Sequence, residues 1–410
     1  MVMKKVLVVG AGGQGGPCAS ILARDKGVSE VILGDIDLDL ANKVKNKINS
    51  SKVTAIKLDA GKIEDIERAA KGVDVIINLT LLEFALNIMK AALKSGVPYV
   101  DSASGEPLWT QLTKGQPLEL DKEFKKAGLT ALIACGGTPG VTNVLTRYYC
   151  DKLDRVDEIR VRLGGKPLGK SKEVVSAWDP GWAPRVALTD YADSPGVFED
   201  GKPTICPPFS GCEEYKFPDP VGPVLVCHHA HEESVTLPRF IGKGLKYCDF
   251  KYPIDPIAGA FVKMGFAKRG AIDVKGVKVE PIDVLMKLVR HPVGTFLSET
   301  ESTAKLPRKS AHFMVIEIKG AKAGENVTYK LMRPSATPEE TLRLYRTFGT
   351  TRIGVALSAI VGAKMCLKDD APKGVIAPEC LNPGNFLKLM ADMGAPVKFS
   401  EVCSKGVTIS

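Results

Sequence analysis

The stretch Val6-Leu7-Val8-Val9-Gly10-Ala11-Gly12-Gly13-Gln14-Gly15 decides how the first third of this chain is expected to fold. Its first four residues form an apolar run typical of a buried β-strand, and Gly10, Gly12 and Gly15 follow in GxGxxG spacing. The first glycine permits a tight turn, the second lets backbone approach a pyrophosphate, and the third allows close helix–strand packing. The stretch predicts a strand–turn–helix unit that binds a dinucleotide, with Gly13 and Gln14 included in the cofactor site.

The sequence has an acidic residue at the position where a dinucleotide-binding unit binds the adenosine ribose. Asp35 follows the predicted second strand at 31–33 and lies 20 residues after Gly15, where a carboxylate binds the ribose hydroxyls of the adenosine. A carboxylate at this place repels a 2′-phosphate, and no arginine follows it in residues 36–39. The sequence therefore favours NAD as the cofactor over NADP.

Strands and helices continue to alternate up to about residue 135. Further apolar, β-branched runs lie at 53–58, 73–77, 97–100 and 131–135, with helical patterns at 63–70 and 83–94 between them. This alternation predicts an α/β fold with a doubly wound parallel sheet of the Rossmann type, covered by helices on both faces.

Three residues near the ends of these strands are also assigned to the cofactor site. Asp59, after the third strand, is placed to bond the adenine amino group, although a helix N-cap is an equally good interpretation. Asn78 follows the strand at 73–77, and Gly137 lies in the glycine-rich segment 135–140 at the predicted domain junction.

The chain changes character after residue 136. Proline and glycine become frequent, and alternating strands replace the strand–helix pattern, with 312–319 and 326–332 forming a predicted hairpin around Gly324. We expect an inserted α+β substrate domain at 137–336, and a nucleotide-binding domain made of 1–136 and 337–410. Thr337-Pro338-Glu339-Glu340 predicts the start of a helix that runs to about Leu367, before a last helix near 384–393.

Composition narrows the function classes. The 410 residues have a net charge of +9, but the lysines are spread along the chain, which favours a solvated basic surface over nucleic-acid binding. No apolar run approaches the ~20 residues that cross a membrane, and none resembles a secretion signal. The ten cysteines show no CxxC spacing. We expect a cytoplasmic protein with reduced thiols, and Cys135 to be a packing thiol because no base lies near it in sequence.

Several of these stretches together resemble the saccharopine dehydrogenase family, and within it lysine 6-dehydrogenases. The matching segments are Gly10–Gly15 with Asp35, Val100-Asp101, Gly140–Leu145 after Pro139, Gly164-Gly165-Lys166-Pro167, the Thr236-Leu237-Pro238-Arg239 turn, and Gly374-Val375 with Pro378-Glu379. The resemblance implies an NAD(P)-dependent dehydrogenase that oxidises a C–N bond, or forms one reductively, on an amino acid, saccharopine or a carboxylated polyamine. We also expect a homodimer.

One segment departs from lysine dehydrogenases. Where those have a segment rich in glycine, serine and threonine, this chain has His228-His229-Ala230-His231-Glu232-Glu233-Ser234. This is more similar to the His-Glu-Glu of carboxynorspermidine dehydrogenases. Reductive condensation of that kind, or a non-catalytic NAD-binding module, is therefore kept as an alternative.

The candidate reaction site combines these segments. Asp101 ends a central strand, where ligands bind in such sheets, although a loop cap is an equally good interpretation. His228, His231 and Glu232 are assigned to catalysis, with an imidazole as proton acceptor. Their spacing matches no standard metal-ligand set, so no metal is expected. Arg239 is assigned as the clamp for a substrate carboxylate, and Thr142 as a second substrate contact.

Overall fold

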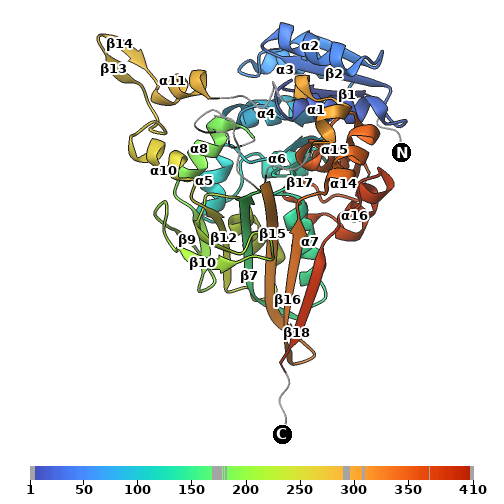
Figure 1. Cartoon of the computed structure of the whole chain (residues 1–410). Coiled ribbons are helices and arrows are strands. Elements are labelled where there is room, and N and C mark those ends of the chain that lie inside the picture. Colours follow the sequence, from blue (N-terminus) through green and yellow to red (C-terminus); the bar gives the residue numbers. More distant parts are fainter. Residues whose placement is uncertain are drawn as a thin grey trace.

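The computed structural model describes residues 5–168, 178, 180, 182–289, 296–306, 310–368 and 370–406 (Figure 1). It contains two large β-sheets. Six strands of the first come from the N-terminal third of the chain and one from its C-terminal part, and the second is built from the middle of the chain and its C-terminal end.

The first sheet has seven parallel strands in the order β17-β6-β5-β4-β1-β2-β3. Their bounds are β1 Lys5–Val9, β2 Glu30–Asp35, β3 Val53–Lys57, β4 Val75–Asn78, β5 Tyr99–Asp101, β6 Thr130–Leu132 and β17 Gly374–Ile376. Strand β17 comes from the C-terminal part of the chain and pairs with β6. The predicted return of the chain to the nucleotide domain is thereby confirmed for this segment.

Helices cover both faces of this sheet. They are α1 Gly15–Arg24, α2 Leu38–Ile48, α3 Ile63–Ala69, α4 Ala85–Ser95, α5 Leu108–Thr113 and α6 Asp121–Lys126, with a short 3-10 turn η1 at Leu82–Phe84. Alternate residues of β1 enter different cores, because successive side chains of a strand point to opposite faces. Val6 and Val8 pack with α1 and α2, whereas Leu7 and Val9 pack with α3 and α4. The doubly wound prediction is confirmed.

The second sheet is mixed and has nine strands. Seven lie in the order β10-β11-β12-β7-β15-β16-β18, and β8 and β9 continue from β12. Their bounds are β7 Arg155–Pro167, β8 Gly196–Glu199, β9 Lys202–Ile205, β10 Glu213–Lys216, β11 Pro223–His228, β12 Tyr247–Pro253, β15 Ser310–Lys322, β16 Glu325–Pro334 and β18 Ser400–Lys405. The predicted hairpin is confirmed as β15–β16, which turns at Ala323 and Gly324 with positive φ.

The helices of this part are α7 Val141–Cys150, α8 Pro184–Ala192, α9 Glu233–Ile241, α10 Pro256–Lys263, α11 Pro281–Leu288 and α13 Glu301–Ala304. A small hairpin of β13 Ile272–Val274 and β14 Val277–Val279 projects beside α10 and α11 (Figure 1). The predicted turn at 236–239 is wrong, because these residues lie inside α9, where Thr236 donates to the Glu232 carbonyl at 3.0 Å.

The C-terminal segment differs from the prediction in two places. The single helix expected up to Leu367 is two helices, α14 Pro338–Phe348 and α15 Gly354–Leu367. Gly349 ends α14 with φ 72°, and Thr350 and Thr351 then bond to the Glu299 carboxylate. After the 3-10 turn η2 (Pro378–Cys380) and α16 (Pro383–Asp392), β18 pairs with β16 of the second sheet. The tail is therefore shared between the sheets, because β16 offers an edge whose backbone groups need partners.

The cysteine prediction also needs a correction. Cys212 and Cys227 form a disulfide, and eight other cysteines are free. The antiparallel register of β10 and β11 brings the two Cα atoms within 4.0 Å across the end of this strand pair. The two cysteines are 15 residues apart, and no spacing motif in the sequence predicts that they pair. Among the described residues, no helix is both long enough and apolar enough to cross a membrane.

Candidate active site

The glycine turn lies between the carboxyl end of β1 and the start of α1. A Cβ atom on Gly15 would lie 1.7 Å from the Gly10 carbonyl oxygen, and one on Gly10 would lie 2.8 Å from the Leu79 carbonyl oxygen. Gly10 also has φ 98°. The buried Oε1 of Gln14 has no hydrogen-bond partner within the described chain. This bare turn before a helix N-terminus fits the pyrophosphate of a dinucleotide.

Asp35 also holds the glycine turn in place. Its Oδ2 accepts a hydrogen bond from the Ala11 backbone N–H at 2.7 Å, and its Oδ1 accepts one from the Asp37 N–H at 2.9 Å. Each carboxylate oxygen has a second lone pair, so the side chain can still accept from a ribose hydroxyl. The predicted ribose contact and the observed bracing of the turn are therefore compatible.

Asp59 and Gly137, the two other residues predicted to bind the cofactor, have close neighbours within the protein. Asp59 accepts from the Gly61 N–H at 2.9 Å and pairs with Lys62 at 3.5 Å. Lys62 occupies the N-cap position of α3, so the alternative N-cap interpretation of Asp59 is wrong. A Cβ on Gly137 would lie 3.4 Å from the carbonyl oxygen of Gly354 at the start of α15. Contact of Asp59 or Gly137 with a cofactor stays a prediction.

A buried polar network joins the carboxyl ends of three neighbouring strands. Asn78 Nδ2 donates to the Tyr99 hydroxyl at 2.9 Å, and that hydroxyl donates to Asp101 Oδ2 at 2.8 Å. Asp101 Oδ1 accepts from the Ala134 N–H at 2.7 Å. Burial raises the pKa of Asp101 to about 8. Asp101 and Asn78 thus fix the strand ends that border the site, and their direct contact with ligands stays a prediction.

His231 and Glu233 form the strongest catalytic arrangement. His231 Nδ1 is hydrogen-bonded to Glu233 Oε2, and the imidazole stacks on the Phe250 ring with centroids 4.0 Å apart. Glu233 is fully buried, and its Oε1 accepts from the Thr142 hydroxyl at 2.6 Å. Burial disfavours the imidazolium, but the Glu233 carboxylate outweighs it and raises the pKa of His231 to about 9. The pair therefore holds a proton on His231 at neutral pH.

Glu232 connects the two domains. Its Oε1 accepts from both the backbone N–H and the hydroxyl of Ser104, at 2.8 and 3.1 Å. Ser104 follows β5 of the first sheet, whereas Glu232 immediately precedes α9. Burial raises the pKa of Glu232, and that of Asp190 on α8, although the positive His231 opposes the shift in both. Three carboxyl groups thus surround one imidazolium.

The other two histidines of the segment have different surroundings. The His229 ring packs against Tyr191 and Tyr252, with centroids 4.7 and 5.2 Å away, and burial lowers its pKa to about 3. His228 ends β11, and its Nε2 lies 3.6 Å from Asp249 Oδ2. Asp249 binds both terminal nitrogens of the buried Arg162 at 2.7 and 2.9 Å. The position of His228 in this charge network argues against its predicted catalytic role.

A cavity of about 390 Å³ adjoins Glu232 and Asp190. Its charged lining consists of six carboxylates, Glu83, Glu106, Asp190, Asp193, Glu232 and Glu280, and three cations, Arg185, Lys268 and Arg269. Arg185 pairs with Asp283, and Arg269 with Asp193 at 2.8 Å, so two of the cations are already neutralised. The excess of carboxylates suits a positively charged ligand.

The two predicted substrate contacts lie elsewhere. Arg239 is exposed near the end of α9, donates to the Gln116 carbonyl at 2.9 Å, and does not line the cavity. Thr142 is fully buried, and its hydroxyl serves Glu233. The structure therefore does not bring Arg239 to the cavity, and it gives Thr142 a supporting position behind Glu233.

Sequence reasoning missed three members of this site. Glu233 was visible beside Glu232, but nothing in the sequence indicated which of the two faces His231. Asp190 and Ser104 belong to no motif in the sequence. They reach the site only because the fold brings α8 and the loop after β5 next to Glu232. Cys135 donates its thiol to the Ser358 carbonyl at 3.4 Å, and burial raises its pKa well above the usual range. Both observations fit the packing role predicted for Cys135.

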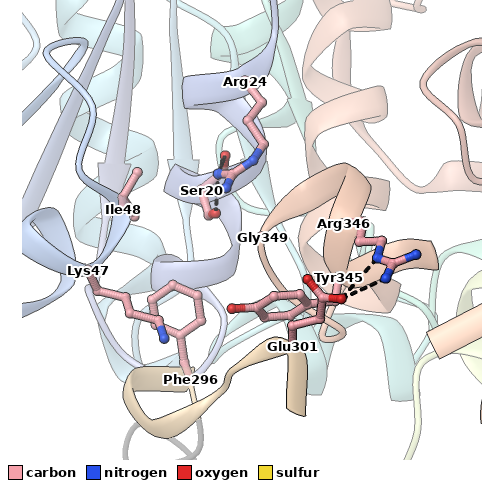
Figure 2. Close-up of a pocket in the computed structure, with 9 residues that line it drawn as sticks. All are labelled: Ser20, Arg24, Lys47, Ile48, Phe296, Glu301, Tyr345, Arg346 and Gly349. Atoms are coloured by element: carbon pink, nitrogen blue, oxygen red, sulfur yellow. Dashed lines mark hydrogen bonds and ion pairs between the residues drawn. The ribbon is translucent and has the colours of Figure 1, made fainter. Parts of the chain in front are cut away.

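A second cavity, of about 350 Å³, lies between α1, α2 and α14 (Figure 2). Arg24, Lys47 and Arg346 contribute to its lining and come from the last turns of these three helices. Cations stabilise the negative end of a helix dipole, which explains them without a ligand. The described part of the chain holds no group of three His, Cys, Asp or Glu side chains arranged to bind a metal ion.

Comparison with known proteins identifies the family. Residues 6–132 match the saccharopine dehydrogenase NADP binding domain, and residues 136–395 match the saccharopine dehydrogenase C-terminal domain. The chain belongs to the saccharopine dehydrogenase family. It is an NAD(P)-dependent oxidoreductase that acts on C–N bonds, and the cofactor-binding domain is the one that carries the Gly10–Gly15 turn.

Two relatives match nearly the whole chain. The chain is 24% identical to carboxyaminopropylagmatine dehydrogenase of Synechocystis, over 96% of this chain and 97% of the relative. It is 27% identical to carboxynorspermidine synthase of Vibrio cholerae, over 95% of each. The fold is similar to that of saccharopine dehydrogenase from Saccharomyces cerevisiae, with a TM-score of 0.66 and 15% identity over 98% of this chain and all of that one.

Proposed function

We propose that this protein condenses a cationic primary amine with an aldehyde that carries a carboxylate, and reduces the resulting imine to a secondary amine. The acidic cavity lined by Ala230 and Glu232, the two chain neighbours of His231, carries this proposal. Its volume of about 390 Å³ falls in the range of small-molecule sites, and carboxylates outnumber cations in its lining. The names of two relatives, a carboxyaminopropylagmatine dehydrogenase and a carboxynorspermidine synthase, describe products of this chemical class.

The buried carboxyls prepare the site for a cation. Burial raises the pKa of Glu232 and of Asp190 because no positive partner compensates their charge fully. A bound ammonium or guanidinium group would stabilise the ionised carboxylates, so binding of the amine is linked to proton release. A carboxylate on the aldehyde would bind Lys268, the cation of the lining that forms no ion pair with a carboxylate among the described residues.

His231 is assigned as the acid of the condensation. Attack of the neutral amine on the aldehyde gives a carbinolamine, whose hydroxyl must be protonated to leave as water and form the iminium. His231 carries a proton below pH about 9, and Glu233 holds its Nδ1, which leaves Nε2 as the donating nitrogen. The Gly10–Gly15 turn and Asp35 would hold NAD(P)H, which would supply the hydride for reduction of the iminium.

The pKa of His231 predicts the pH dependence of each direction. Reductive condensation needs the imidazolium, so its rate should fall as the pH rises through about 9. Oxidation of the secondary amine needs the neutral imidazole and a neutral amine, so its rate should rise over the same range. Initial rates in both directions across pH 6–10 test this assignment.

The substrate proposal is tested by product analysis. Aspartate 4-semialdehyde is mixed with NADH or NADPH and with agmatine, 1,3-diaminopropane or lysine, and the secondary amines are identified by mass spectrometry. We expect a condensation product with an amine that carries a second positive group, and a loss of about tenfold or more in kcat/KM in Asp190→Asn. Reduction of NAD by lysine alone, with no condensation product, would instead support the lysine 6-dehydrogenase type.

A further inference from the structure

Glu379 is a buried carboxyl group that the proposed reaction does not use. It lies in η2, behind α7 and α9, and its side chain has no exposed surface. Its Oε2 accepts from Asn143 Nδ2 at 3.0 Å. Its Oε1 is enclosed and has no hydrogen-bond partner within the described chain. A buried polar atom without a partner is costly, so its retention needs a reason.

Asn143 and the first turn of α7 connect this carboxyl group to the His231–Glu233 pair. Asn143, which donates to Glu379, directly follows Thr142 in that turn. The Thr142 hydroxyl donates its one proton to Glu233 Oε1 at 2.6 Å, and Glu233 Oε2 bonds to His231. Asn143 is further fixed by its bonds to the Thr236 hydroxyl at 3.0 Å and to the Gly140 N–H at 2.9 Å. Every member between Glu379 and His231 is therefore held on more than one side.

The charges around Glu379 favour its neutral form. Burial, reinforced by the nearby Glu233 carboxylate, raises the pKa of Glu379 to about 7. The other titratable groups close to it are the thiols of Cys135, Cys248 and Cys380, which burial also keeps protonated. Arg147 donates at 3.4 Å to the backbone carbonyl of Glu379, leaving the carboxyl oxygens without this cation.

We propose that Glu379 is a positioning residue for the His231–Glu233 pair: its carboxyl group braces Asn143 in the first turn of α7, and Thr142, held by that turn, keeps the Glu233 carboxylate turned toward His231. The proposal rests on the proposed function only where it gives His231 the role of the acid.

The groups that face His231 directly are Glu233, Glu232, Asp190 and His229. Glu379 adds to this set from behind Glu233.

The direction of its effect follows from electrostatics. When Glu379 loses its proton, a second negative charge appears behind Glu233 and favours the imidazolium, so His231 keeps its proton to higher pH. Glu379→Gln is neutral at every pH and removes this contribution, while its amide oxygen can still accept from Asn143. Glu379→Ala removes the brace as well.

The test measures His231 itself. The imidazole titration is followed by NMR on protein labelled at histidine, with His231→Asn used to assign its signal. We expect Glu379→Gln to lower the His231 pKa by about half a pH unit or more, and to keep kcat at pH 6 within about twofold. Glu379→Ala should lower kcat about tenfold with the KM for the nicotinamide cofactor unchanged, and should cause no further loss in a His231→Ala background.

The matched control is Glu325→Gln, which removes an exposed carboxylate at the start of β16 and should change neither quantity. An unchanged His231 titration in Glu379→Gln, or a Glu379→Ala variant that loses only thermal stability, overturns the proposal. A shifted titration in a protein that condenses no amine with an aldehyde would support the positioning role and refute the proposed function. The two proposals therefore fail separately.

Discussion

The glycine turn at 10–15 and the histidine segment at 228–233 are built alike and work differently. Each has six residues, begins at or just after the end of a strand, and ends at the first residue of a helix. In the glycine turn, Gly15 is required because its missing Cβ leaves room for the Gly10 carbonyl within the same turn. In the histidine segment, His228 faces Asp249, His231 faces Glu233, and Glu232 reaches Ser104 in the other domain.

The two segments differ in where the groups that they contact come from. A turn whose function depends on backbone space carries its own constraints, so its residue types alone predict its role. A segment of polar side chains takes its function from the strands and helices that approach it, since neighbours decide which side chain is charged. Burial among aromatic rings keeps His229 neutral, whereas Glu233 keeps the nearby His231 charged.

The largest expected effect separates two histidines of one segment. His231→Ala should lower kcat by about 100-fold or more with the affinity for the cofactor unchanged, because it removes the proposed acid. His228→Ala should keep kcat within about threefold, since His228 contacts Asp249 on another network. Steady-state kinetics and NADH titration on both variants measure this. Equal losses in the two variants would restore the catalytic assignment of His228.

The next effect tests whether the glycine turn depends on space. Gly15→Ala should weaken cofactor binding by about 30-fold or more, because its Cβ would lie 1.7 Å from the Gly10 carbonyl oxygen and the turn must move. Gly354→Ala is the control, since nothing lies within 4 Å of a Cβ built there. Binding is measured by NADH fluorescence and folding by circular dichroism. Unchanged binding in Gly15→Ala would place the cofactor away from this turn.

A smaller effect is expected at the acid that supports the turn. NADH should bind more tightly than NADPH, and Asp35→Ala should narrow the difference by about tenfold by removing a charge that repels a 2′-phosphate. Affinity for NADH should also fall, because Ala11 loses the oxygen that its N–H contacts at 2.7 Å. Asp35→Asn separates the two causes, as its amide oxygen can replace one acceptor without the charge. Tighter binding of NADPH by the unmodified protein would contradict the NAD preference.

The smallest effect is expected at Arg239. Arg239→Ala should change the KM for a carboxylated substrate by less than about threefold, because the exposed side chain donates to the Gln116 carbonyl and lies outside the cavity. Lys268→Ala, within the lining, should raise that KM by about fivefold. A larger effect at Arg239 than at Lys268 would return the carboxylate clamp to the residue that sequence alone suggested.

The observed strands and helices show which sequence patterns predicted the structure and which did not. Asp101 was expected at the end of a central strand and lies there, because strand order in a parallel sheet follows from short apolar runs and their connections. The helix expected to continue to Leu367 ends at Gly349, which has a positive φ, and Thr350 and Thr351 then bond to Glu299. The sequence did not predict this break, because the apolar pattern is helical on both sides of it. The Cys212–Cys227 pair likewise depends on the register of two strands.

The sequence by itself determined the Rossmann half, its glycine turn and Asp35, because these depend on contacts between residues close in the chain and on alternating apolar patterns that repeat locally. Only the tertiary structure decided that Ala230 and Glu232, on either side of His231, line the acidic cavity, that Arg239 stays outside its lining, and that Glu379 lies behind the His231–Glu233 pair. These outcomes rest on contacts between residues as far apart as Asn143 and Glu379, 236 positions along the chain. The charge of a buried group depends on such neighbours, which no local pattern records.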